Sequence, residues 1–381
     1  KENIGSHIIR RCNIHDCGQT GIVGHLGGVF SIIEDNHIHH INNKQNLAGA
    51  EIGGIKMHAA IDVIIRRNHF HHCTRGLWLD WQAQGTRVTQ NLFHDNTLPN
   101  EENANPEGMD GIGEDIFIEI SHGPTLVDNN VLLSDRAMKL ATQGVAVVHN
   151  LIAGSFTAVG RGVNNGSEKL PSPRYTPYHV PHRTEINGFM TVLHGDCRFY
   201  NNIFIQKPVR AGMEEIRKLT GDNEWDDGNL TAGTAPYSGY PTLEEYVARF
   251  EGYCGMGSGK SPDLYYEKLP VWLCNVYFNG AKPAEQEQDA VVDTEHEITI
   301  GVKEENGKWK LETNVYDYLP QNACAVISTE TLGMAFEPEQ KYENPDGTPI
   351  VFRYDYFGNR QGIHPLPGPF ASKEAAEEAL S

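Results

Sequence analysis

The sequence is poor in basic residues. Lysine and arginine together number 31, against 50 aspartates and glutamates, so the formal net charge is −19. A surface this acidic repels phosphate backbones and anionic lipids. Long apolar runs are also absent, since none approaches the roughly 20 residues that a membrane-spanning helix needs. We therefore expect neither nucleic acid nor a membrane among the partners of the chain.

Cysteine is sparse and scattered, with seven residues in the chain and no pair at zinc-ribbon spacing. We predict reduced core thiols rather than a disulfide scaffold, and from these a cytoplasmic location. The glycine-rich stretch Gly252–Lys260 lacks the pattern of a phosphate-binding loop. The chain opens at Lys1 and enters an apolar run almost at once, so we expect more chain upstream.

An internal repeat is the strongest pattern present. Eight segments align on one position, which is asparagine in seven of them, and the residues three before and two after it are always apolar. This is the alternation of two strands on either side of a fixed turn residue. The eight anchor residues are Cys12, Asn36, Asn68, Asn91, Asn130, Asn150, Asn202 and Asn275.

The repeat predicts an all-β fold, a right-handed parallel β-helix in which each coil packs on its neighbours. The shortest spacings between anchors are 20, 23 and 24 residues, typical of solenoid coils, and the longer ones indicate inserted loops. Asparagine tolerates the left-handed turn conformation, and stacked asparagines would form a ladder of amides. We assign residues 1–280 to the β-helix, with a long insertion at 206–270, and residues 281–381 to a β-rich segment that caps it.

A further strand precedes each anchor and aligns as a five-residue unit. Its second and fourth residues are mainly apolar and are predicted to point inward, so the third and fifth point outward. One outward column is Val23, Lys56, Trp78, Phe117 and Lys139, and the other is His25, His58, Asp80, Glu119 and Ala141.

Asp80 and Glu119 are thus predicted to be neighbours on adjacent coils. Parallel strands lie about 4.7–4.9 Å apart, which places the two carboxyl groups at roughly the separation found in retaining glycosidases. Two acids so close should differ in pKa, one ionised and one protonated. Trp78 and Phe117 would offer aromatic faces to a sugar, and Lys56 and Lys139 would bind hydroxyls or keep the acids charged.

Insertions at residues 40–53 and 96–114 fall just before this strand, where loops would wall a pocket. Glu51 lies near its rim, and His58 continues the column of Asp80. Trp81 and His122 flank the acids, either as substrate ligands or as packing residues. The competing interpretation is that an outward carboxylate on a solenoid is simply solvated.

A second column follows the anchors at a distance of three residues: His15, His39, His71 and His94. It looks like a ladder of metal ligands, but it lies on another face and no carboxylate is seen to join it. We predict stacked surface imidazoles, no metal site and no cofactor.

The segments Gly76–Asn96 and Asp115–Pro124 resemble glycoside hydrolase family 120, the β-xylosidases with a parallel β-helix. The resemblance implies that Asp80 is the nucleophile, that Glu119 is the acid/base, and that the substrate is a xylo-oligosaccharide. It also implies homo-oligomers and an upstream part of the β-helix interrupted by a β-sandwich. The loop at 97–113 is longer than is usual in that family.

Two other functions remain open from the residues. A β-helix polysaccharide lyase needs a Lys or Arg base, which Lys56 or Lys139 would supply, and often a calcium site, for which no acidic cluster is evident. Its unsaturated product would absorb ultraviolet light. A non-catalytic, carbohydrate-binding solenoid would show no activity in any assay.

Overall fold

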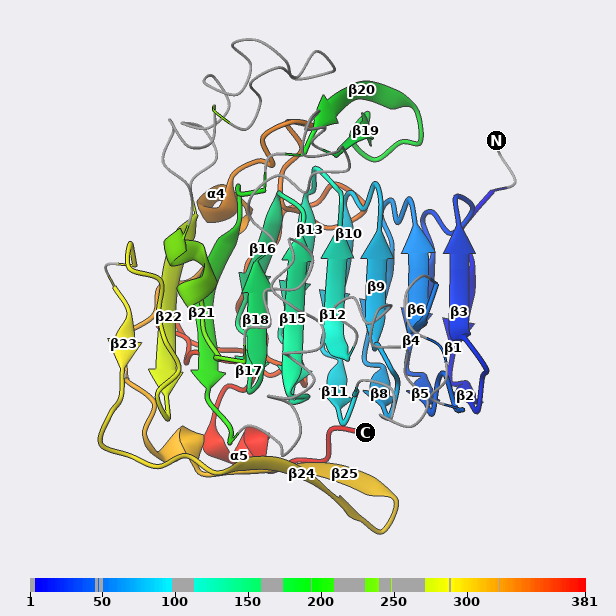
Figure 1. Ribbon diagram of the computed structural model, residues 1–381. Helices are drawn as coiled ribbons and strands as arrows, with labels where there is room; N and C mark the ends of the chain where they lie inside the picture. The colour runs from blue at the N-terminus through cyan, green and yellow to red at the C-terminus, as the bar shows by residue number, and fades with distance from the viewer. Residues whose placement is uncertain are drawn as a thin grey trace.

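Coils of a parallel β-helix stack along one axis in the computed structural model (Figure 1). The structure describes residues 4–44, 47, 51–97, 113–158, 174–192, 194–208, 230–239, 248, 271–287, 289–321 and 323–381. Much of the predicted 206–270 insertion therefore lies outside the described residues, as do residues 98–112. Each of the first six coils contributes three strands, and each strand pairs in parallel with its counterparts in neighbouring coils.

The strands before the anchor form one row: β1 (Ile8–Arg10), β4 (Ile32–Glu34), β7 (Ile64–Arg66), β10 (Thr86–Thr89), β13 (Thr125–Asp128) and β16 (Val145–Val148). Those after it form a second row: β2 (Asn13–His15), β5 (His37–His39), β8 (His69–His71), β11 (Leu92–His94), β14 (Val131–Leu132) and β17 (Leu151–Ile152). Both rows meet in β21 (Arg198–Ile205), which is followed by β22 (Trp272–Phe278) and β23 (Val291–Val292).

The third row is a six-stranded parallel sheet, in the order β18-β15-β12-β9-β6-β3. Its strands are β3 (Thr20–His25), β6 (Gly53–His58), β9 (Leu77–Asp80), β12 (Glu114–Glu119), β15 (Arg136–Ala141) and β18 (Ser155–Ala158). Two antiparallel hairpins are added to the coils, β19 (Tyr175–His179) with β20 (Ile186–Thr191) and β24 (Ile300–Glu305) with β25 (Lys308–Thr313). The described helices are single turns: η2 (Ala235–Gly239), η3 (Val315–Asp317), α4 (Thr329–Leu332) and α5 (Lys373–Ala376).

The predicted asparagine ladder is present and buried. In each step the side-chain oxygen of one anchor accepts hydrogen bonds from the backbone N–H and the side-chain NH₂ of the anchor one coil earlier, at 2.8–3.2 Å. The ladder begins at the backbone N–H of Cys12 and ends at Asn275, whose N–H groups donate to Glu287. Each buried amide therefore satisfies the next, so the ladder fixes the register of every coil.

One detail of the turn differs from the prediction. The left-handed backbone conformation belongs to the residue before the anchor in seven of the eight coils, for example Asp35 (φ 56°), Arg67 (φ 51°) and Gln90 (φ 58°), not to the asparagine. The asparagine side chain points inward to the ladder, and the preceding residue turns the chain. The all-β prediction is confirmed, and the apolar residues on either side of the anchor form the core.

Residues 281–381 do more than close the last coil. Strand β23 pairs with β22 as a cap would, but most of the segment lies along the side of the solenoid. Tyr342, Ile350 and Phe352 pack on Leu126 and Val148, which point outward from β13 and β16. The run from Ile298 to Val315, with Asn-Gly near its centre, predicts a hairpin, which β24 and β25 form with the turn at Asn306 and Gly307.

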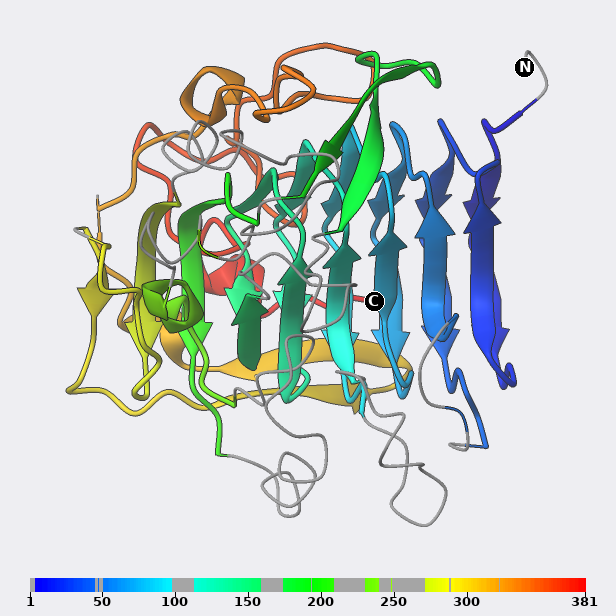
Figure 2. The ribbon, with the colours of Figure 1, turned by 45° about the horizontal axis from the view of Figure 1, so that its top comes forward.

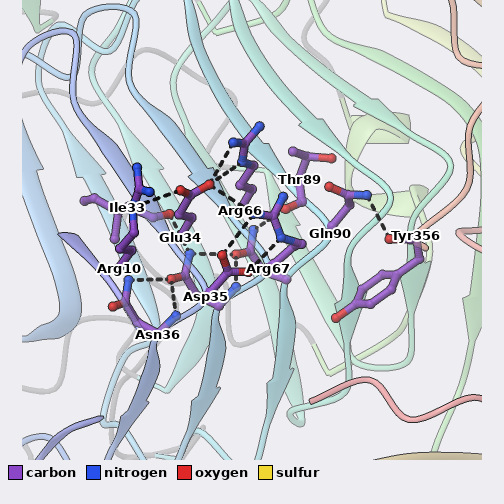
Figure 3. A network of polar contacts seen from close by, with 12 residues as sticks. Arg10, Ile33, Glu34, Asp35, Asn36, Arg66, Arg67, Thr89, Gln90 and Tyr356 are labelled. Carbon is purple, nitrogen blue, oxygen red and sulfur yellow. Dashed lines mark hydrogen bonds and ion pairs between the residues drawn. The ribbon is translucent and has the colours of Figure 1, made fainter. Parts of the chain in front are cut away.

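Ion pairs cover the outer face of β1, β4 and β7 (Figure 3). Glu34 binds Arg10 at 3.3 Å, Arg66 at 2.7 Å and Arg67 at 3.0 Å, and Arg67 also binds Asp35 at 2.7 Å. Burial opposes ionisation of Glu34, but the bond from Arg66 and the three positive charges outweigh it and lower its pKa. These pairs tie three coils together on a surface without apolar cover.

Six cysteines lie within the described part of the chain, and all six are free thiols. Cys73, Cys197 and Cys324 are buried, as predicted for core thiols, but Cys12 is exposed because its side chain takes no part in the ladder. No helix within the described residues has the length and apolarity to cross a bilayer.

The ladder generates a test of stability. Asn91→Ala leaves the backbone N–H of Asn68 without its acceptor and removes one of the two donors to the side-chain oxygen of Asn130, all fully or nearly fully buried. We expect a loss of about 2–5 kcal/mol in unfolding free energy, since each unsatisfied buried group costs about 1–3 kcal/mol. Urea unfolding followed by circular dichroism measures it.

Cys12→Ala is the matched control, because this anchor contributes only its backbone. It should change the unfolding free energy by no more than about 0.5 kcal/mol. Equal effects of the two substitutions would show that the amide ladder contributes nothing to stability.

Candidate active site

The register of the six-stranded sheet places the predicted columns side by side. Lys56 is paired with Trp78, and Trp78 with Phe117, while His58 is paired with Asp80. Asp80 and Glu119 end their strands, β9 and β12, one residue beyond the paired Leu79 and Ile118. The prediction that these two acids are outward neighbours on adjacent coils is therefore confirmed. The position before β9 requires a glycine, Gly76, because a Cβ there would lie 2.5 Å from the carbonyl oxygen of Asp115 in the next coil.

Asp80 is buried against two nitrogen-bearing side chains of the preceding coil. Its Oδ2 atom lies 3.0 Å from Lys56 Nζ and 2.9 Å from His58 Nε2. Its Oδ1 atom accepts a 2.9 Å hydrogen bond from the backbone N–H of Trp81. Both oxygens of the carboxylate are therefore held in place by contacts with nitrogen atoms.

Lys56 joins three of the predicted residues. Its ammonium group is fully buried, pairs with Glu51 as well as Asp80, and lies 3.1 Å from His58 Nε2. Burial and this neighbouring charge lower the pKa of His58. Glu51, His58 and Asp80 bring their ligand atoms within 4.8 Å of one another, which resembles a metal site. The ammonium group occupies the position of the cation, so the prediction of no metal at this place fits the residues present.

Glu119 has different surroundings. Trp78 Nε1 donates a 3.1 Å hydrogen bond to its Oε2 atom, and Arg174 forms an ion pair with its Oε1 atom. Burial, followed by the negative charge of Asp80, raises the pKa of Glu119, and the opposing effect of Arg174 is smaller. The two neighbouring acids are therefore unequal, with Glu119 the better holder of a proton.

Trp78 and Phe117 do not offer open faces to a sugar, contrary to the prediction. Their rings stack at 5.3 Å and are almost fully buried. The Arg75 guanidinium lies 4.3 Å from the centre of the Trp78 ring and 4.7 Å from that of Phe117, and Lys139 Nζ lies 5.2 Å from Phe117. The outward direction is correct, but cationic side chains cover the rings, so Trp78 serves as a hydrogen-bond donor to Glu119. Lys139 is buried with the rings rather than facing ligand.

Trp81 is the exposed aromatic residue beside the acids, with 36% of its surface accessible. The Arg174 guanidinium lies 5.1 Å from its ring centre. His122, in contrast, is buried, and its Nε2 atom lies 3.1 Å from the carbonyl oxygen of Thr176 in β19. Burial lowers the pKa of His122 to about 4, so the ring is neutral and donates to that carbonyl. His122 is thus a packing residue that holds the hairpin.

Sequence reasoning missed Arg174 and the hairpin β19–β20. Figures 1 and 2 show the hairpin at the end of the sheet where β9 and β12 finish. Gln84 fixes it there by two hydrogen bonds with the backbone of His179, at 2.8 and 2.9 Å. The only signal in the sequence was the 52-residue interval between two anchors, Asn150 and Asn202. Arg75 was also missed, although it precedes β9 directly and pairs with Glu114 at 2.9 Å.

The two loops predicted to wall the site are described in part. Residues 45–46, 48–50 and 98–112 lie outside the described residues, so that prediction stays open for them. Glu51, at the end of the first loop, is half exposed and contacts Lys56, which agrees with its predicted place at the rim.

Comparisons with known proteins agree with this architecture. Residues 2–157 match the family model described as a right-handed β-helix region. A solved structure, described as the complex of XylC with xylose, is similar over the whole of this chain, with 39% sequence identity and a TM-score of 0.75. The chain spans about half of that protein, 52% of its length. No curated protein matches the chain. The chain is thus a right-handed parallel β-helix protein whose resemblance to glycoside hydrolase family 120 is confirmed.

Proposed function

We propose that the chain is a retaining glycoside hydrolase, an exo-acting β-xylosidase that releases xylose from xylo-oligosaccharides without a cofactor. The observation that carries the proposal is the pair Asp80 and Glu119, which end adjacent strands in unlike surroundings. The spacing of adjacent strands matches the separation of about 5–5.5 Å between the carboxyl groups of retaining enzymes, whereas inverting enzymes need room for a water molecule.

Asp80 is suited to be the nucleophile. Lys56 and His58 hold its Oδ2 atom, which fixes the rotamer of the side chain. A carboxylate oxygen has two lone pairs, so Oδ1 can attack an anomeric carbon while it accepts the hydrogen bond from Trp81. Attack gives a covalent glycosyl-enzyme as the C–O bond to the leaving group breaks.

Glu119 is suited to be the acid and then the base. Its raised pKa keeps the proton that the departing oxygen needs in the first step. Once the proton has left, the Arg174 guanidinium stabilises the carboxylate that must take a proton from water in the second step. The surroundings of Glu119, namely its burial and its ion pair with Arg174, therefore serve both half-reactions.

The residues around the two acids and the sugar bound in the similar structure both support a pentose as the substrate. Trp81 offers an exposed ring beside the acids, and Glu51 and His58 add polar groups at one edge. The sugar bound in the XylC complex is xylose. These two observations support a xyloside as the substrate, and the family resemblance supports exo-action.

The site is less suited to a polysaccharide lyase. A lyase base must be an unprotonated Lys or Arg that reaches the substrate, yet Lys56 is fully buried and forms ion pairs with Glu51 and Asp80. Among the described residues, the cluster of Glu51, His58 and Asp80 holds the Lys56 ammonium group rather than calcium. Formation of a product with ultraviolet absorbance from a uronate polymer would favour the lyase instead.

The first test of function removes the nucleophile. Asp80→Asn should lower turnover of an aryl β-xyloside by about 10³-fold or more, because no glycosyl-enzyme can form. Added azide should restore turnover and give α-xylosyl azide, identified by NMR, since the small anion attacks from the vacated side. The wild type should release reducing sugar without ultraviolet absorbance.

Asp35→Asn, which removes an acid on the opposite face, is the control and should retain wild-type turnover. A wild type inactive on every aryl glycoside would overturn the proposal and favour the non-catalytic solenoid. An Asp80→Asn variant as active as the wild type would remove Asp80 from the mechanism.

The second test concerns the protonation of Glu119. The first step needs protonated Glu119, so kcat/KM should fall as pH rises through its pKa. Arg174 lowers that pKa, and Arg174→Met should therefore move the alkaline limb of the profile to higher pH. The measurement is kcat/KM against pH for an aryl β-xyloside with a poor leaving group, which depends on acid catalysis.

Arg183→Met is the matched control, because Arg183 lies in the turn of the same hairpin, is exposed, and pairs with Glu185. It should leave the profile unchanged. An alkaline limb that stays in place or moves to lower pH in Arg174→Met would contradict the assignment of Glu119 as the acid.

A further inference from the structure

Histidines from three successive coils gather on the face formed by the second row of strands. His37 and His39 lie on β5, His69 and His71 on β8, and His94 on β11. Their rings stack at the spacing of the coils, with 4.8 Å between the centroids of His37 and His69 and 5.1 Å between those of His71 and His94. Alternate residues of a strand share a face, so two columns of imidazoles run side by side.

This cluster is not the exposed stack that the sequence suggested. His69, His71 and His94 are buried. Trp309 of β25 covers them, with ring centroids at 5.1, 5.5 and 4.5 Å, and Figure 1 shows the hairpin β24–β25 along this edge of the solenoid. The predicted stacking is confirmed and His15 lies at the surface, but the prediction of surface imidazoles is wrong for His71 and His94, because the C-terminal segment folds back along the coils.

Carboxylates also join the column, contrary to the prediction. His94 Nδ1 lies 2.6 Å from Asp95 Oδ2, and His15 Nδ1 lies 2.6 Å from Asp16 Oδ2. A carboxylate that accepts the Nδ1–H proton leaves Nε2 with a free lone pair, the arrangement that commonly orients a metal-binding histidine. The Nε2 atom of His94 points at His69 Nε2, 2.7 Å away.

The ring nitrogens of the two columns face one another. His37 Nε2 lies 2.7 Å from His71 Nε2, and His37, His69 and His71 each bring one ring nitrogen within 4.8 Å of the others. Zinc binds imidazole nitrogen at about 2.0–2.1 Å, which sets ligand nitrogens roughly 3.3 Å apart in a tetrahedral site. Small rotations of the rings reach this geometry from the distances present.

We infer that His37, His69 and His71 form a binding site for a borderline transition-metal ion such as Zn²⁺, with His94 or water as the fourth ligand. Imidazole is a preferred ligand of zinc, copper and nickel, whereas calcium and magnesium prefer oxygen. A cavity of about 520 Å³ lined by His37 and His69 leads to the cluster. The site lies on a different row of strands from Asp80 and Glu119, so it is separate from the proposed hydrolase chemistry.

The experiment is a titration of metal-free wild type with CoCl₂, followed by its visible ligand-field bands, and with ZnCl₂ by calorimetry. We expect one equivalent per chain, displacement of Co²⁺ by Zn²⁺, and a rise in the unfolding midpoint when Zn²⁺ is bound. His71→Phe keeps a stacked ring without its nitrogens, and His37→Gln removes the half-exposed ligand. Each should weaken Zn²⁺ binding at least tenfold.

His15→Gln is the matched control, because His15 belongs to the same column but lies outside the group of three. It should bind Zn²⁺ like the wild type. Absence of saturable binding to the wild type would overturn the inference, as would wild-type affinity in both His71→Phe and His37→Gln.

A measurement on the wild type alone guards against variants that fail to fold. The electron paramagnetic resonance spectrum with one equivalent of Cu²⁺ should show hyperfine structure from at least three imidazole nitrogens. A spectrum with fewer nitrogens would overturn the site, whatever the variants do.

Discussion

The fixed distance between parallel strands governs this molecule. Coils in register repeat at about 4.7–4.9 Å, and each outward or inward position becomes a column of stacked side chains. The amides of the anchor column bond at 2.8–3.2 Å, Phe70 stacks on Phe93 at 4.4 Å, and His39 on His71 at 5.0 Å. Asp80 and Glu119 are brought together by the same constraint, so the separation that the proposed chemistry needs is a property of the backbone.

A column of acids is unfavourable unless charge is supplied from outside it. Asp80 receives the ammonium of Lys56 from the preceding coil, and Glu119 receives the guanidinium of Arg174 from a hairpin. Removal of either cation would leave a buried carboxylate without a positively charged side chain of Lys or Arg beside it, which is costly. The two acids differ because Asp80 has two nitrogen donors on one oxygen, whereas burial dominates at Glu119. Their proposed division into nucleophile and acid therefore rests on their neighbours, not on the acids themselves.

The sequence predicted what depends on local register. The ladder, the columns of the six-stranded sheet and the hairpin at Asn306 follow from alternation and spacing within one coil or turn. Contacts between distant segments were not predictable: Trp309 covers histidines about 240 residues earlier in the chain, and Arg174 reaches Glu119. A repeat shows which residues stack, but it carries no signal for what packs on the stack. The buried state of the histidines was missed for that reason.

The hairpin β19–β20 shows how a rigid solenoid acquires a tuned site. It belongs to no coil, yet Gln84 and His122 fix its backbone, and His182 in its turn lies 3.1 Å from Asp62. Because it is held at these points, Arg174 meets Glu119 in a fixed place. The sequence of an inserted hairpin can change without loss of the asparagine ladder, whereas an anchor asparagine cannot be replaced without breaking a step of it. The coils therefore determine where the two acids lie, and the inserted hairpin adjusts how firmly one of them holds its proton.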